Sequence, residues 1–134
     1  MQTVQVPIWM WVKHSTWEPV AVSVPAGDVT VTAVARPQVA VWSMGDGAEV
    51  FCHGPGTPYS DRYSPKAGSP DCGYTYRHAS VSSPGGAYTL SVRVVWIVQW
   101  HGAGRSGTMP GLVTAAHRQL AVGEVQAVAT ADGG

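Results

Sequence analysis

The stretch 87–100 constrains the fold more than any other part of the chain, because apolar and polar residues alternate along nearly all of it. The apolar residues at alternate positions are Tyr88, Leu90, Val92, Val94, Trp96, Val98 and Trp100. Between them stand Thr89, Ser91, Arg93 and Gln99, with Val95 and Ile97 as exceptions. Successive side chains of a β-strand point to opposite faces, so the pattern predicts one long strand with one face against a core.

The rest of the chain repeats this signal in shorter segments. Valine- and threonine-rich runs alternate with glycine and proline, and no window keeps an apolar stripe at the helical period. We therefore expect an all-β fold. The predicted strands cover residues 4–12, 19–24, 28–35, 38–44, 49–53, 73–80, 87–100, 111–121 and 123–131. Residues 102–108 are rich in glycine and predict a flexible hairpin loop.

Length and charge limit the classes of protein to consider. A chain of 134 residues makes a single domain, 1–134, that buries roughly 65–70% of its unfolded surface. Eight acidic and eight basic residues give a net charge of zero, and charged residues are only 12% of the chain. There is thus no basic surface for nucleic acid. No apolar run reaches the ~18 residues that would predict a membrane span.

The two cysteines, Cys52 and Cys72, flank a stretch rich in turn-forming residues. Such a pair can be a disulfide, part of a metal site or two thiols. The loop 53–72 has no periodicity and needs a brace, which favours a disulfide. Closing about 21 residues would remove about 3 kcal/mol of unfolded-chain entropy. A disulfide implies an oxidising, extracellular or cell-surface location, and we expect the leader of a longer protein to lie upstream of Met1.

A predicted strand ends in a bend at Trp42-Ser43-Met44-Gly45-Asp46-Gly47. With Tyr76, Gly86 and Tyr88, these residues resemble the signature of the PKD (polycystic-kidney-disease) domain, an immunoglobulin-like two-sheet antiparallel β-sandwich. The resemblance covers residues 28–100, with Met44 where the family usually has Phe. It implies a structural motif in which Trp42 fills the core, Gly45 and Gly47 turn the backbone and Asp46 accepts hydrogen bonds from the bend.

The whole chain also resembles the C-terminal part of a family of secreted actinobacterial proteins of unknown function. The Pro-x-Trp-x-Trp-Val start at residues 7–12, the Gly-Asp-Gly and cysteine loop, and the Val-Gly-Glu-Val-Gln-Ala-Val run at residues 122–128 carry this resemblance. It implies secretion and a role at the cell surface, and it supplies no ligand.

Aromatic residues are the candidate binding groups. Trp9 and Trp11 share one face of a strand, with Ile8, Met10 and Val12 on the other. If the aliphatic face points inward, the two rings form an exposed platform that stacks on sugars or contacts a protein; if not, they belong to the core. Tyr59 and Tyr63 in the long loop are further stacking candidates. We interpret Trp42, Trp96 and Trp100 as core residues.

No pattern in the chain indicates a reaction. The five histidines are scattered, Cys52, His53 and Cys72 lack a fourth ligand at zinc spacing, and no nucleophile motif is present. We expect no enzyme, no cofactor and no metal. The sequence predicts a non-catalytic extracellular module for protein interaction or structural spacing, with carbohydrate binding as the alternative. Its partner would be a protein or a cell-surface polysaccharide.

Overall fold

The structure is a computed structural model that describes residues 2–64 and 66–123. Its regular elements are strands, joined by loops and by three short 3₁₀ turns. The strands are β1 (Gln2–Thr3), β2 (Pro7–Trp9), β3 (Val20–Ala26), β4 (Val29–Ser43), β5 (Glu49–Cys52), β6 (Gly73–Thr75), β7 (Tyr88–Gly102), β8 (Arg105–Leu120) and β9 (Val122–Gly123). The turns are η1 (His14–Thr16), η2 (Ser80–Ser82) and η3 (Pro84–Gly86). The predicted all-β class is confirmed.

The main sheet is antiparallel and has the strand order β3-β4-β7-β8. The outer edge of β4 serves two partners in succession, β3 along residues 29–35 and β5 along residues 40–43. Where the partner changes, the register of β4 against β7 shifts between Pro37 and Val39. The prediction of two strands, 28–35 and 38–44, was therefore wrong, because a bulge at this proline bends one strand without ending it.

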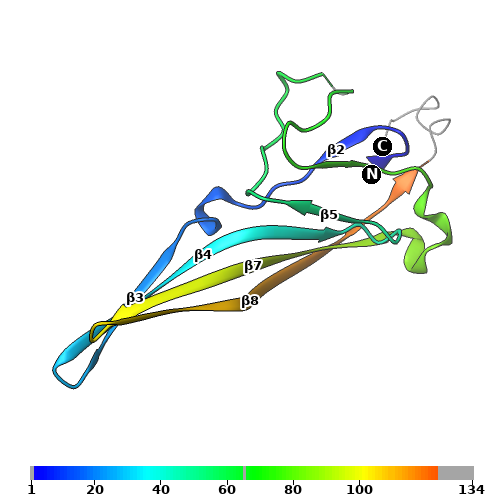
Figure 1. Ribbon diagram of the computed structural model, residues 1–134. Helices are drawn as coiled ribbons and strands as arrows, with labels where there is room; N and C mark the ends of the chain where they lie inside the picture. Colours follow the sequence, from blue (N-terminus) through cyan, green and yellow to red (C-terminus); the bar gives the residue numbers. More distant parts are fainter. Residues whose placement is uncertain (1, 65, 124–134) are drawn as a thin grey trace.

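A smaller second layer lies over one end of this sheet (Figure 1). It contains the antiparallel pair β2-β6 and the parallel pair β1-β9. The buried hydroxyl of Ser80 in η2 holds β9 in place, because it accepts a hydrogen bond from the Val122 amide at 2.8 Å. The same hydroxyl donates a hydrogen bond to the Gly86 carbonyl at 2.7 Å. Two layers of strands thus enclose the core, as expected for a β-sandwich.

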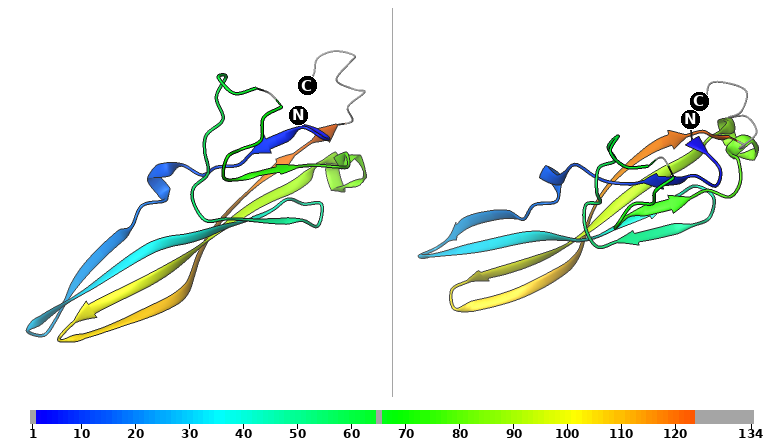
Figure 2. Two further views of the ribbon diagram at one scale, coloured as in Figure 1. Left: turned by 45° about the horizontal axis from the view of Figure 1, so that its top comes forward. Right: turned by 90° about the horizontal axis from the view of Figure 1, so that it is seen from above.

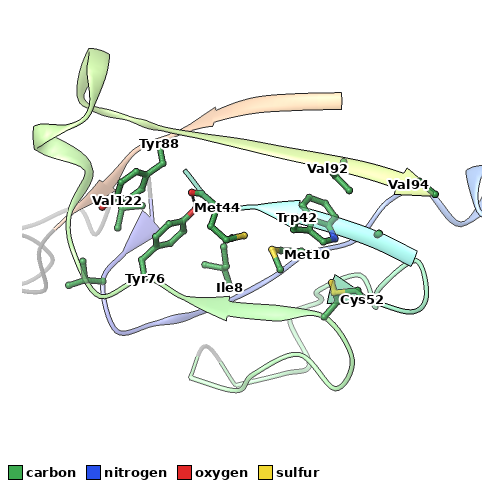
Figure 3. Packing of buried hydrophobic residues seen from close by; sticks show 13 residues of the cluster. Ile8, Met10, Trp42, Met44, Cys52, Tyr76, Tyr88, Val92, Val94 and Val122 are labelled. Atoms are coloured by element: carbon green, nitrogen blue, oxygen red, sulfur yellow. Dashed lines mark hydrogen bonds between the residues drawn. A yellow bond between two sulfur atoms is a disulfide. The ribbon is translucent and has the colours of Figure 1, made fainter. Parts of the chain in front are cut away.

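The core lies between the layers and is built on large side chains. Met44 and Tyr76 are fully buried, and Trp42 is only 8% exposed. Figure 3 shows Trp42 beside Met10 of the second layer, with Val92 and Val94 of β7 above them. Trp96 packs against the edge of this cluster, whereas Trp100 lies beyond it. The interpretation of Trp100 as a core residue was wrong.

Two long hairpins, β3-β4 and β7-β8, extend well past the second layer, and all the views show them leaving the body together (Figures 1 and 2). The expected flexible loop at 102–108 is a tight turn at Ala103 and Gly104, both with positive φ, and strand β8 begins at Arg105. The predicted strand 73–80 is much shorter, because η2 follows it. The predicted strand 123–131 lies outside the described residues from position 124 onward.

Candidate interaction surfaces

The Gly-Asp-Gly bend after β4 is a structural site. Gly45 and Gly47 have φ of +85° and +96°, and a Cβ on Gly45 would come within 2.8 Å of Tyr88 Cβ. The Asp46 carboxylate accepts a hydrogen bond from the Ala48 amide, which closes the bend. Both glycines and Asp46 have the roles expected of them, because glycine is favoured where φ is positive and an aspartate here stabilises the turn.

Three tyrosines, Tyr74, Tyr76 and Tyr88, pack beside this bend. Tyr76 and Tyr88 stack with ring planes 7° apart and centroids 5.0 Å apart, and Tyr74 meets Tyr76 edge-on. The hydroxyl of Tyr76 donates to the Met44 carbonyl at 2.7 Å, as Figure 3 shows. The hydroxyl of Tyr74 donates to the Asp46 carboxylate. Every one of these polar groups has a partner inside the protein, so the cluster holds the fold together and leaves no group directed at a ligand.

Burial and the nearby Asp46 carboxylate change the acidity of these tyrosines. The pKa of Tyr74 rises to about 12, chiefly because burial disfavours the phenolate and then because of its hydrogen bond to Asp46. Burial, followed by the charge on Asp46, also raises the pKa of Tyr76 and of Tyr88. All three stay neutral over the physiological pH range, which is the state that can donate the hydrogen bonds described above.

The loop 53–72 is closed at its neck. The disulfide between Cys52 and Cys72, expected from the sequence, is present, with the two Cα atoms 5.6 Å apart. Beside it, the Asp71 carboxylate accepts hydrogen bonds from the amide and hydroxyl of Thr57 and from the Ser69 hydroxyl. Both cysteines are buried in the core cluster. The neck is therefore fixed by one covalent bond and by three hydrogen bonds to a single carboxylate.

Trp9 anchors the far part of the same loop. Its indole lies 4.5 Å from the Tyr63 ring and 5.3 Å from the Tyr59 ring, centroid to centroid, and its Nε1–H donates to the Ala67 carbonyl at 2.9 Å. The sequence left open whether the aliphatic or the aromatic face of this strand points inward. Ile8 and Met10 are buried, so the aliphatic face does. Three of the four candidate binding aromatics thus meet, but in a cluster that folds the loop back on its strand.

Trp11, the fourth candidate, stands apart from this cluster. Its side chain is 41% exposed at the rim of a groove of about 680 Å³, which runs between residues 8–16 and the inner face of β7 and β8. Trp42, Val92 and Val94 form the apolar floor of the groove, and Arg118 of β8 lies along its wall. Trp9 and Trp11 consequently do not form the joint platform that the sequence offered as one alternative.

A second surface, which the sequence analysis did not single out, lies on the two protruding hairpins. Their shared part, residues 20–37 of β3 and β4 with residues 96–112 of β7 and β8, is called the distal sheet below. The strand register places one set of side chains on the side of the sheet that carries the core. On β3 and β4 these are Val20, Val22, Val24, Val29, Val31, three alanines and Pro37. On β7 and β8 they are Trp96, Val98, Trp100, Met109 and Leu112, with Arg105 at the hairpin tip.

This apolar face of the distal sheet carries one charged residue, Arg105 at the tip of the β7-β8 hairpin, and much of the face is open to solvent. Val22 is 57% exposed, Leu112 51% and Met109 60%. Trp100 lies flat over Gly107 of the neighbouring strand, where an added Cβ would fall 2.5 Å from the indole Nε1. The ring therefore rests on the backbone of β8 and lies outside the core cluster between the two layers.

The opposite face of the distal sheet is largely polar. Ser23 and Thr32 exchange a hydrogen bond there at 2.9 Å, and Gln99 lies opposite Thr108. The sequence already indicated that the distal sheet has one apolar and one polar face, because Val29, Val31 and Ala33 alternate with threonines. Residues 87–100 alternate in the same way. Alternation indicates that one face is apolar, but it does not reveal whether another layer covers that face.

Within the part of the chain that the structure describes, no three His, Cys, Asp or Glu side chains gather as metal ligands would. Within the same residues, no helix has the length and apolarity of a membrane span. The His14 ring instead makes a hydrogen bond to the Gly56 carbonyl at 2.8 Å, where the loop crosses the strand. Comparisons of the chain with family models, with curated proteins and with solved structures find no match.

Proposed function

We propose that this chain is a non-catalytic, extracellular interaction module whose contact surface is the apolar face of the distal sheet. The proposal takes the β-sandwich to be immunoglobulin-like, of the PKD type. The bend at Asp46 between two positive-φ glycines, with Trp42 in the core, supports that type. The disulfide supports an oxidising compartment such as the cell surface.

One observation carries the proposal: the distal sheet has one polar face and one apolar face, and among residues 2–64 and 66–123 no layer of strands covers the apolar face. Monomeric proteins rarely expose contiguous apolar areas of more than a few hundred Å², and larger ones mark interaction sites. Val22 and Met109, on opposite hairpins, are both more than half exposed on this face. A spacer alone would need no such face, so interaction is the better-supported half of the predicted role.

The test places a photo-crosslinking amino acid at Met109, or at Thr108 as a matched control. These neighbours on β8 lie on opposite faces, and both are exposed. The labelled protein is applied to the intact surface of the cells that produce it and irradiated. The proposal expects protein adducts from position 109 and few from position 108. Equal adducts from both positions, or none from either, would refute it.

A second candidate function is polysaccharide binding at Trp11. The observation in its favour is that this indole is 41% exposed beside an open groove, and an exposed aromatic ring can stack on a sugar. The measurement is the change in tryptophan fluorescence on adding soluble cell-wall polysaccharide. Binding should be lost in Trp11→Ala and kept in Trp17→Ala, since Trp17 packs against the core cluster. Equal binding by both variants would exclude Trp11.

A further inference from the structure

We infer that the partner of the apolar face is a second copy of the same face, so that two chains pack by stacking their distal sheets. This inference rests on the proposed function and names its partner. The register places a single charged residue on this face, Arg105 at the tip of the β7-β8 hairpin. An antiparallel pair of copies sets the two arginines at opposite ends, so like charges do not meet. Symmetric pairing through one self-complementary patch is also the commonest form of oligomer.

The edges of the distal sheet favour stacking over strand-to-strand pairing. Proline supplies no backbone N–H, and bulges twist an edge away from a flat partner, so both protect edge strands from adding another strand. The outer strand β3 contains Pro25, and the outer strand β8 contains Pro110. The register of β8 also shifts next to this proline, at Gly111, which has φ of +95°. The apolar face is therefore the part of the distal sheet that remains open to a partner.

The area of the face is sufficient for a weak dimer. Four strands spaced ~4.8 Å apart, each with about eight residues rising ~3.3 Å, cover roughly 500 Å². Two such faces bury about 1,000 Å² in total, which reaches the lower limit of specific interfaces. Interfaces of this size form transient complexes, so we expect dissociation in the micromolar range.

The second layer restricts how the two copies can be oriented. It lies on the same side of the main sheet as the apolar face, because Trp42 and Val94, which contact it, share that side with Trp96. If both copies pointed the same way, their second layers would collide. An antiparallel arrangement avoids this, since the hairpins of each copy then reach toward the partner's second layer. The partner's sheet continues that layer at the usual sheet spacing of about 10 Å.

The experiment is sedimentation analysis of the purified chain over a range of concentrations. We expect a species of twice the 14.1 kDa mass to appear as concentration rises. Met109→Lys puts a charge into the apolar face and should weaken the dimer at least about tenfold, because an unpaired charge is costly to bury. Thr108→Lys puts the same charge on the opposite face and should leave the dimer unchanged. Circular dichroism checks that both variants keep their strands.

Each result separates this inference from the function on which it rests. A dimer that Met109→Lys does not weaken uses another surface and overturns the inference. A chain that stays monomeric up to ~200 μM overturns it too, because that concentration is far above the micromolar dissociation expected for such an interface. In that case the crosslinking experiment still decides the interaction role: an adduct with a different protein from position 109 supports it, and no adduct refutes it.

Discussion

Removal of the disulfide gives the sharpest test of what holds the loop 53–72. The bond joins residues 20 positions apart in the sequence. The chain-entropy relation for a loop of about 21 residues gives an entropy change near −11 cal/mol/K, or about 3 kcal/mol at 25 °C. For a domain with a stability of 5–15 kcal/mol, this is a substantial share. The double variant Cys52→Ala with Cys72→Ala should lose about that much.

The assay is urea unfolding followed by circular dichroism, comparing the double variant with the unchanged protein. Most of the loss should come from the unfolded chain, because the Asp71 hydrogen bonds and the Trp9 cluster still close the native loop. The indole N–H signal of Trp9 in the NMR spectrum should therefore stay in place. A loss below about 1 kcal/mol would refute the entropic reasoning. A displaced Trp9 signal would show that the disulfide itself holds the native loop.

Two further predictions concern the tyrosine cluster and the distal sheet. Because the pKa of Tyr74 is raised to about 12, the folded protein keeps a proton that the unfolded chain releases above pH 10. Stability in urea should be complete below pH 10 and fall as the pH rises toward 12, and Tyr74→Phe should make that fall less steep. Gly107→Ala should displace the Trp100 ring, seen as one shifted indole N–H signal, because the added Cβ would overlap the indole. Gly68→Ala, at a position with open space around it, should leave that signal unchanged.

The features that the sequence predicted correctly depend on neighbouring residues. The bend around Asp46 follows from two glycines that can adopt positive φ, and the disulfide follows from two cysteines that flank a loop needing a brace. Tyr76 and Tyr88, which the motif resemblance also names, stack on each other. Such features are encoded locally, so the sequence of one chain is enough to find them.

The features that the sequence missed depend on residues far apart. Pro37 looked like the end of a strand, but pairing with β7 on one side carries β4 past it. Trp100 looked like a core residue because it continues the alternation of Val92 and Val94, yet the second layer ends before it. Alternation fixes which face a side chain takes, whereas the length of the opposite layer fixes whether that face is buried.

The continuity of two strands explains how the apolar face stays exposed. β4 and β7 run without interruption from the core into the distal sheet, where they pair with each other up to Thr32 and His101. A free two-stranded hairpin is marginally stable in water, but here the four strands form one hydrogen-bonded sheet with the body of the protein. Folding the apolar face onto itself would break that ladder. The face is therefore held open, and a partner that covers it need not first order it.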